Sequence, residues 1–385
     1  MSVKATAITP EVLVWARKRA GLSLSDVALY MHKEVEDIAT WEAGIAWPTY
    51  NQLEKLAEGL YHRPVALFFL PEPPEEVDPQ QEFRTLPDFD ISTLSVDTRF
   101  AVRLGRSYQE SLRELTGGVN PADRHLLRDF TLGRSRDINM VTRKLRNYLG
   151  VSLAQQQSWC TTADAMTAWR GSVEAVGIFV FKRSFKQREV SGFCLMDDEF
   201  PIIMINNSTA FTRQIFTLFH EVAHLLHGLS SITTVDGRFV ERMSGTMKSV
   251  EVACNQLAAE FLVPNDAFPW EEIDQHNIVY SVSAVASHFN VSREVILRLI
   301  LDRGWVDSQT YRDCVRAWAE EADSGRGGSG GDYYNNQAAY LGDTYLRLAF
   351  SQYRAGVIPV SELAEHLGVK ARNISKFEDK LGVRI

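Results

Sequence analysis

Apolar residues recur at helical spacing through the first seventy positions of the chain, and glycines and a capping serine interrupt them. Gly21 and Gly44 break the pattern, and Ser23 stands where an N-cap is expected. The pattern predicts four short helices, near residues 11–19, 23–31, 34–41 and from 49 onward. The proline-rich, acidic stretch 71–81 that follows has few apolar residues, which is typical of a linker.

The periodicity changes in the middle of the chain. Residues 95–175 keep a mostly helical spacing, but then three short apolar runs are separated by polar turns: 178–181, 192–195 and 202–205. Such runs predict a small sheet. Two longer helices are expected afterwards, over 212–227 and 249–262, the second ended by Pro264. The fold class predicted is therefore α+β and mostly helical, with helices at both ends of the chain.

Composition and charge narrow the function classes. With 385 residues, 45% hydrophobic and 23% charged, the chain has the profile of a soluble protein with two or three domains. No apolar run approaches the eighteen or so residues of a membrane span, and the first residues do not resemble a secretory signal. The four cysteines form no C-x-x-C pair, so we expect reduced thiols, a cytoplasmic location and no membrane partner. A net charge of −8 means that any contact with DNA must come from a local patch.

The strongest chemical signal is the sequence His-Glu-Val-Ala-His at 220–224. Side chains four residues apart share one face of a helix, so His220 and His224 can direct their imidazoles to one metal ion. Glu221 stands beside them, where a carboxylate can take a proton from a metal-bound water. The surrounding residues are apolar and predict a buried helix, in which polar side chains need partners. This pattern predicts a zinc hydrolase site with Glu221 as general base.

Zinc in a hydrolase needs a third protein ligand, and the spacing alone leaves the choice open. The candidates are Glu251, Glu260, Glu241, Asp236 and His227. The Cα of His227 would lie about 10 Å from that of His220, so a tetrahedron closed by all three histidines would be strained. Glu251 and Glu260 are nine residues apart on one predicted helix, close to opposite faces, so only one of them can face the metal.

Three stretches of the chain resemble the ImmA/IrrE family of metallopeptidases. They are Phe216–His227, Glu251–Asn255 and Ala259–Pro264, and the resemblance extends over about 160–310. It implies that Zn²⁺ is held by His220, His224 and Glu251, with Glu221 as the catalytic base. Val222-Ala223 stands where leucine-glycine is common in the family. An oxyanion donor is also required, and His227 and Tyr280 are the candidates. The simpler interpretation is that each of them is an ordinary packed residue.

The N-terminal helices are similar to the Xre/Cro-type helix-turn-helix. The similarity lies in Arg19–Ala28, Ile38–Gly44 and Pro48-Thr49. It implies that residues 33–40 approach the major groove, and the candidate DNA contacts are Arg17, Lys18, Arg19, Lys33 and Thr40. Residues 1–70 hold seven lysines and arginines against eight acidic residues, a poor balance for phosphate binding. The alternative is a helix-turn-helix fold used for dimerisation or for sensing another protein.

Together these features predict a modular regulator. The expected modules are a helix-turn-helix bundle (1–70), a linker (71–90), a helical connector (91–160), a zincin-like peptidase (161–320), a Gly/Ser-rich linker (321–335) and a helical tail with its own helix-turn-helix pattern (336–385). The expected function is a DNA-associated zinc endopeptidase that cleaves a specific protein such as a repressor. The alternative is a transcriptional regulator or antitoxin whose zinc domain binds a partner without cleaving it. Expected partners are operator DNA, a protein substrate or a toxin, and a second copy in a homodimer.

Overall fold

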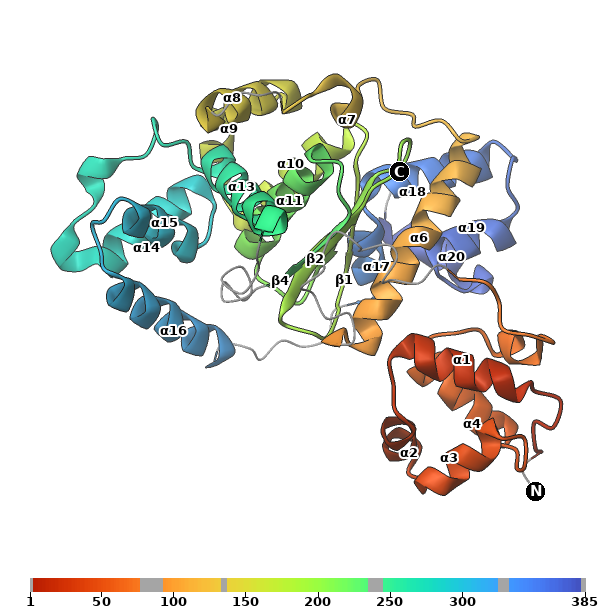
Figure 1. Cartoon of the computed structure of the whole chain (residues 1–385). Helices are drawn as coiled ribbons and strands as arrows, with labels where there is room; N and C mark the ends of the chain where they lie inside the picture. Colours follow the sequence, from red (N-terminus) through yellow and green to blue (C-terminus); the bar gives the residue numbers. More distant parts are fainter. Residues whose placement is uncertain (1–2, 77–92, 133–136, 235–244, 325–331, 382–385) are drawn as a thin grey trace. The chain divides into compact units, whose positions relative to one another are not determined.

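The computed structural model describes residues 3–76, 93–132, 137–234, 245–324 and 332–381. Two compact units make up the chain (Figure 1). The first comprises Met1–Leu104 with Phe185–Gln187, and the second comprises Gly105–Ser184 with Arg188–Ile385. Among the described helices, none combines the length and the apolarity that crossing a bilayer requires.

The first unit contains the helices predicted from the N-terminal pattern. They are α1 (Pro10–Ala20), α2 (Leu24–Met31), α3 (Val35–Glu42) and α4 (Tyr50–Glu54), followed by the helical turns η1 (Lys55–Leu60) and η2 (Val65–Phe69). Ser23 caps α2 through a reciprocal hydrogen-bond pair with Asp26, as its position in the sequence predicts. Gly21 ends α1 with a φ of 74°, a left-handed conformation that glycine adopts without strain. The apolar faces of these helices share one core that includes Val12, Val27, Ile38, Leu53 and Phe68.

The second unit is built around a four-stranded mixed sheet. Its strands are β1 (Phe179–Arg183), β2 (Val190–Leu195), β3 (Ile202–Asn206) and β4 (Ser231–Thr234), in the order β1-β3-β2-β4. β1 and β3 are parallel, whereas β2 runs antiparallel to both β3 and β4. The first three strands confirm the prediction. The fourth was not predicted, because four residues with a single large apolar side chain give too short a pattern.

Helices cover both faces of this sheet, which explains why every residue of β2 and β3 is buried. On one face, Phe181 of β1 stacks on Tyr108 of α6 (Val96–Thr116) with ring centroids 4.2 Å apart. On the other face, Cys194, Ile203 and Ile205 join the core formed with α10 (Thr162–Glu174) and α11 (Phe211–Leu226). Figure 1 shows α10 and α11 on one side of the strands and α17 on the other.

Further helices complete the second unit. They are α7 (Leu126–Asp129), α8 (Ile138–Leu149), α9 (Leu153–Ser158), α13 (Gly245–Leu262), α14 (Ile278–Phe289), α15 (Arg293–Asp302), α16 (Ser308–Ser324), α17 (Tyr333–Leu341), α18 (Asp343–Arg354), α19 (Val360–Leu367) and α20 (Ile374–Leu381), with short turns η4 (Trp270–Glu272), η5 (Gln275–Asn277) and η6 (Ala371–Asn373). The mostly helical α+β class predicted from the sequence is therefore observed.

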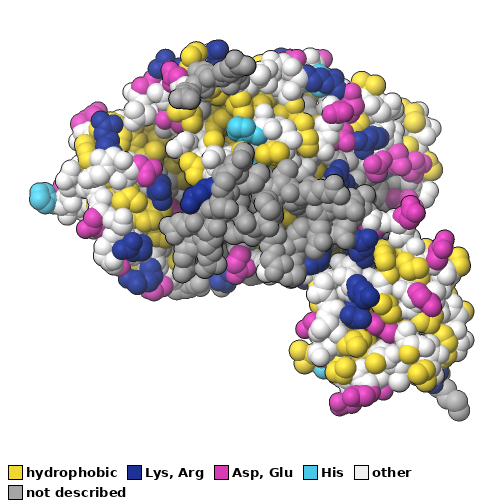
Figure 2. Space-filling view, viewed as in Figure 1, with side chains coloured by type: hydrophobic (Ala, Val, Ile, Leu, Met, Phe, Trp, Pro, Cys, Tyr) yellow, Lys and Arg dark blue, Asp and Glu magenta, His cyan; other side chains and the backbone are white. Residues whose placement is uncertain are grey.

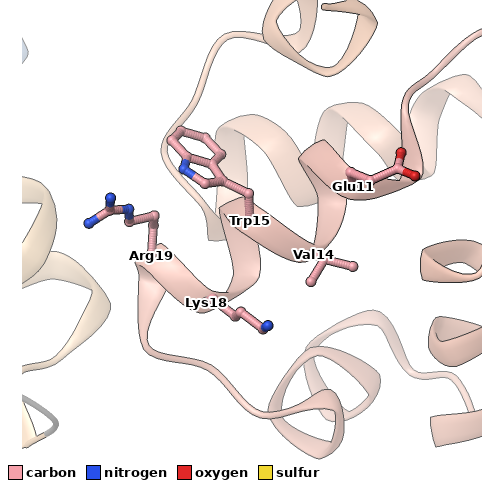
Figure 3. Close-up of a pocket in the computed structure, with 5 residues that line it drawn as sticks. All are labelled: Glu11, Val14, Trp15, Lys18 and Arg19. Atoms are coloured by element: carbon pink, nitrogen blue, oxygen red, sulfur yellow. The ribbon is translucent and has the colours of Figure 1, made fainter. Parts of the chain in front are cut away.

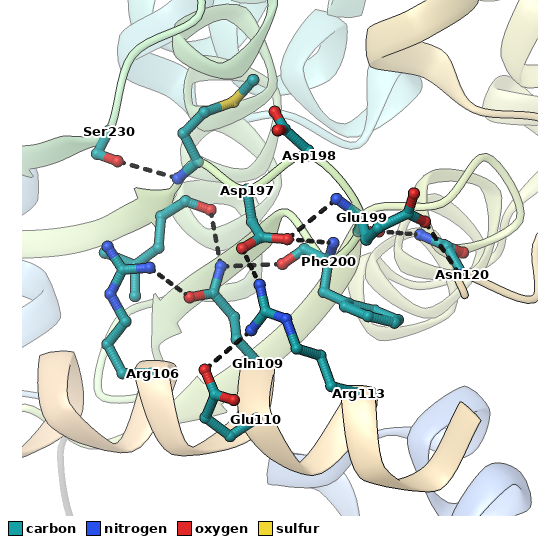
Figure 4. A network of polar contacts seen from close by, with 12 residues as sticks. Arg106, Gln109, Glu110, Arg113, Asn120, Asp197, Asp198, Glu199, Phe200 and Ser230 are labelled. Carbon is teal, nitrogen blue, oxygen red and sulfur yellow. Dashed lines mark hydrogen bonds and ion pairs between the residues drawn. The ribbon is translucent and has the colours of Figure 1, made fainter. Parts of the chain in front are cut away.

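A polar network fixes the turn between β2 and β3 (Figure 4). The side-chain amide of Gln109 on α6 donates to the carbonyl oxygen of Phe200 at 2.9 Å. Asp197 forms an ion pair with Arg113, and its Oδ1 accepts the backbone N–H groups of Glu199 (3.0 Å) and Phe200 (2.8 Å). The turn thus places its carboxylate where backbone donors and a cation satisfy it.

The C-terminal helices belong to the same compact unit as the sheet. Arg170 of α10 is buried, and its guanidinium donates to the carbonyl oxygens of Ala339 and Leu341, both at 2.8 Å, at the end of α17. Its Nε also contacts Glu174 Oε1 at 2.9 Å, and Glu174 Oε2 accepts from Thr344 at 2.7 Å. Of the Gly/Ser-rich stretch 321–335 predicted as a linker, residues 325–331 lie outside the described residues, whereas 321–324 belong to α16 and 333–335 to α17. The segment 336–381 is therefore held to the sheet domain by a buried arginine.

Candidate metal centre

Helix α11 carries the His-Glu-Val-Ala-His sequence through the middle of the core. Phe219 packs between Trp169 and Phe261, with ring centroids 4.8 and 4.2 Å away. Every residue from Thr217 to Leu225 is buried. The helix ends at Leu226, His227 is its C-cap, and Gly228 then adopts a φ of 72°. The apolar sequence therefore buries His220 and His224, whose side chains are 0% and 1% exposed.

Helix α13 brings the carboxylate to these histidines. Its buried face includes Cys254, Leu257, Ala258 and Phe261, and it packs directly against α11. Glu251 lies three residues before Cys254 and seven before Ala258, so it shares that face by helical periodicity. The packing of the two helices thus directs Glu251 toward α11.

Three side chains converge in this core. The Nε2 atoms of His220 and His224 lie 3.0 Å apart. Glu251 Oε1 is 3.0 Å from His220 Nε2, and Glu251 Oε2 is 3.1 Å from His224 Nε2. Each residue offers one ligand atom within 4.8 Å of the others. The structure therefore brings together the three residues that were predicted to hold the metal.

Burial and charge act in opposite directions on these groups. Burial alone would raise the pKa of Glu251, but the two imidazoles lower it well below its ordinary value. Burial alone would lower the pKa of His220, but the Glu251 carboxylate raises it. A buried carboxylate that stays ionised beside two imidazoles is the donor set that a divalent cation prefers.

The size of this cluster fits zinc. Ligand atoms held at about 2.0–2.1 Å in a tetrahedron are separated by about 3.3 Å. The two Nε2 atoms are 3.0 Å apart and each lies 3.0–3.1 Å from a different oxygen of Glu251, so the three side chains are close enough to share one such ion. Three protein ligands leave the fourth position for water or substrate, which is the arrangement of a catalytic zinc and not of a structural one.

Glu221 lies beside this cluster and does not belong to it. Its side chain is 0% exposed, and its Oε2 accepts a hydrogen bond of 2.5 Å from the hydroxyl of Ser231 on β4. Its Oε1 has no hydrogen-bond partner among the described residues. A buried carboxylate oxygen without a protein partner can accept a proton from a bound water molecule.

The sequence comparison agrees with this geometry. Residues 173–300 match the family model Peptidase M78, the IrrE N-terminal-like domain. The matched segment runs from the end of α10 into α15 and contains all four residues of the site. It indicates a metallopeptidase-type domain in this part of the chain. A search of curated proteins finds no match.

The other described candidates for the third ligand, Glu260 and His227, do not belong to the cluster. Glu260 accepts a hydrogen bond of 3.0 Å from the backbone N–H of Asn265, at the end of α13. His227 is exposed beyond the last turn of α11. Glu241 and Asp236 fall outside the described residues. Of the two candidate oxyanion donors, Tyr280 is 72% exposed on α14 and His227 is exposed after the end of α11, and the role of each stays a prediction.

The candidate DNA contacts occupy the first unit. Arg17 forms two hydrogen bonds of 2.7 and 2.9 Å with Glu42 and a third with the carbonyl oxygen of Leu22. Arg19 donates to the carbonyl oxygen of Glu76 at 2.8 Å. These contacts hold both guanidinium groups against the protein. DNA binding remains a prediction for this unit.

The remaining candidates on this unit are Lys18, Lys33 and Thr40. Lys18 is exposed, and Figure 3 shows it with Arg19 along one side of α1, in a pocket also lined by Glu11, Val14 and Trp15. Lys33 is exposed and lies 3.4 Å from Asp37. Thr40 donates to the carbonyl oxygen of Asp37 at 2.7 Å. On the face of this unit that Figure 2 shows, basic and acidic side chains are interspersed.

The sequence interpretation missed Ser231 and Cys194. Ser231 donates to Glu221, and Cys194 Sγ lies 3.2 Å from the Ser231 hydroxyl oxygen. Burial, followed by the charge of Glu221, raises the pKa of the Cys194 thiol. Both residues are in strands that pack on α11. Only the pairing of β4 with β2 brings them there, so no local sequence signal marks them.

Proposed function

We propose that this protein is a zinc-dependent endopeptidase that cleaves a specific protein, such as a repressor. The observation that supports this most directly is the cluster of His220, His224 and Glu251, with Glu221 beside it. A bound zinc ion would polarise the scissile carbonyl and lower the pKa of a bound water.

The protein's own residues supply the rest of the reaction. His220, His224 and Glu251 would hold the ion. Glu221 Oε1, which has no protein partner among the described residues, takes the proton of the attacking water. The same carboxylic acid then returns this proton to the leaving amine, while Glu221 Oε2 stays bonded to Ser231. The apolar core around α11 strengthens these interactions by excluding water.

The N-terminal unit would bring this activity to DNA. We propose that the unit binds an operator, as part of a homodimer, and that the peptidase acts on a repressor or toxin bound nearby. The exposed Lys18 and Lys33 are the side chains of this set that are available for phosphate contacts. A mobility-shift assay on the chain's own promoter tests this part. Replacing both lysines with alanine should weaken binding and reduce its dependence on salt.

Comparison of the native protein with Glu221→Gln in cells tests the peptidase activity. Glutamine keeps the shape of the side chain but cannot accept the proton, so zinc binding should persist while cleavage is lost. Mass spectrometry of protein N-termini should then find new termini only in cells that express the native protein. Identical termini with both proteins, each loaded with zinc, would favour the alternative of a regulator or antitoxin whose zinc domain binds a partner without cleaving it.

A further inference from the structure

Ser231 links strand β4 to the proposed base. Its side chain is buried, with the whole residue 1% exposed, and its hydroxyl donates to Glu221 Oε2 at 2.5 Å. On its other side, the hydroxyl oxygen lies 3.2 Å from Cys194 Sγ. The thiol of Cys194 also reaches the carbonyl oxygen of Leu229 at 3.5 Å. Ser231 thus sits between a thiol and a carboxylate, and all three residues are buried.

The hydrogen bond from Ser231 engages only one of the two carboxylate oxygens of Glu221. A terminal carboxylate torsion is broad and roughly two-fold, so an unheld carboxylate samples several orientations. A hydroxyl that donates to an ionised carboxylate forms one of the stronger hydrogen bonds in proteins. It holds Oε2, whereas Oε1 has no partner among the described residues.

We propose that Ser231 is a positioning residue for Glu221. By holding Oε2 it fixes the rotation of the carboxylate, so that Oε1 is the oxygen that receives the proton of the incoming water. The proposal rests on the proposed function, because it assumes that Glu221 is the base. A serine with only a structural role would change stability when replaced, but it would not change how Glu221 meets a ligand on the metal.

The chain offers a matched control for this serine. Ser191 on β2 is also 1% exposed, and its hydroxyl donates to the carbonyl oxygen of Thr233 at 3.3 Å. Ser191→Ala removes a buried hydroxyl from the same sheet without touching Glu221. Ser231→Thr keeps the hydroxyl at position 231.

Acetohydroxamic acid serves as the probe, because it chelates zinc through two oxygens and retains a proton that a neighbouring carboxylate can accept. Its dissociation constant is measured by calorimetry on the zinc-loaded full chain, and zinc affinity is measured separately by competition with a chelator. We expect Ser231→Ala and Glu221→Gln to weaken hydroxamate binding by about tenfold, the loss of one charge-assisted hydrogen bond. Ser231→Thr and Ser191→Ala should bind within about twofold of the native protein, and all four should keep their zinc affinity.

The outcomes separate this inference from the proposed function. Weak binding by Glu221→Gln with native binding by Ser231→Ala overturns the inference and leaves Glu221 as the base. Native hydroxamate binding by both variants would show that Glu221 is not the base, and the inference would then be wrong as well. If Ser231→Ala fails to fold or to bind zinc, Ser231→Thr decides: zinc-loaded Ser231→Thr with native hydroxamate binding supports the role, and a tenfold loss contradicts it.

Discussion

The Nε2 atoms of His220 and His224, one helical turn apart on α11, lie 3.0 Å from each other, and both residues are buried. Neither ring has a hydrogen-bond partner for its Nδ1 atom among the described residues. Two buried imidazoles this close cannot meet each other's need for polar partners. A cation shared with the facing carboxylate can bind both of them.

Glu251→Gln should abolish tight zinc binding, because an amide oxygen is a much weaker zinc ligand than a carboxylate. We expect the affinity for zinc to fall by at least about a hundredfold, more than the loss of a supporting group outside the ligand set. Glu260→Gln is the matched control on the same helix and should leave zinc affinity unchanged, since Glu260 bonds to Asn265. Chelator competition on both purified variants measures this. Equal losses of zinc affinity in the two variants would show that Glu251 is not a ligand.

The two histidines and the glutamate between them could be predicted from the sequence, because helical periodicity alone puts His220 and His224 on one face. Glu251 could not be chosen by periodicity. Its face depends on how α13 packs against α11, which is a tertiary contact. Ser231 was beyond prediction for the same reason, since it reaches Glu221 only through the pairing of β4 with β2.

The helix and strand positions were largely predictable, because apolar residues dominate α11 and the strands that it covers. The attachment of the C-terminal helices was not. Arg170 sits within an ordinary helical pattern, and its acceptors lie about 170 residues further along the chain. Long-range contacts of this kind leave no local periodic signal.

Arg170→Met should destabilise the second unit strongly. It would leave Glu174 buried with its carboxylate unpaired, and the carbonyl oxygens of Ala339 and Leu341 without donors. Breaking a buried pair in this way costs about 3–5 kcal/mol of unfolding free energy. Arg316→Met, which removes an exposed pair with Asp313 on α16, should cost less than about 1 kcal/mol. Urea denaturation of both variants makes the comparison, and similar small losses would show that Arg170 does not hold the C-terminal helices.

The buried Lys182 should make the stability of the protein depend on pH. Burial, with the nearby charge of Arg170, lowers the pKa of Lys182 to about 7 from its ordinary 10.5. Between these two pKa values, Lys182 carries a proton in the unfolded chain but not in the folded one. The contribution of Lys182 to the free energy of unfolding therefore becomes more favourable as pH rises from about 7 to 10.5. Lys182→Met should therefore be more stable than the native protein at neutral pH.

The advantage of Lys182→Met should be on the order of 1–3 kcal/mol near pH 7 and should shrink as pH rises toward 10. Denaturation at several pH values measures it, with Lys144→Met at an exposed position of α8 as the control. An advantage that stays constant with pH would mean that Lys182 is not neutral in the folded protein.

Anomalous X-ray scattering at the zinc absorption edge, from crystals of the zinc-loaded protein, tests the central claim most directly. The account predicts one strong peak at bonding distance, about 2.0–2.2 Å, from His220 Nε2, His224 Nε2 and a Glu251 carboxylate oxygen, with Glu221 outside the ligand set. A peak elsewhere in the chain, or zinc bound with Glu221 as a ligand in place of Glu251, would contradict it.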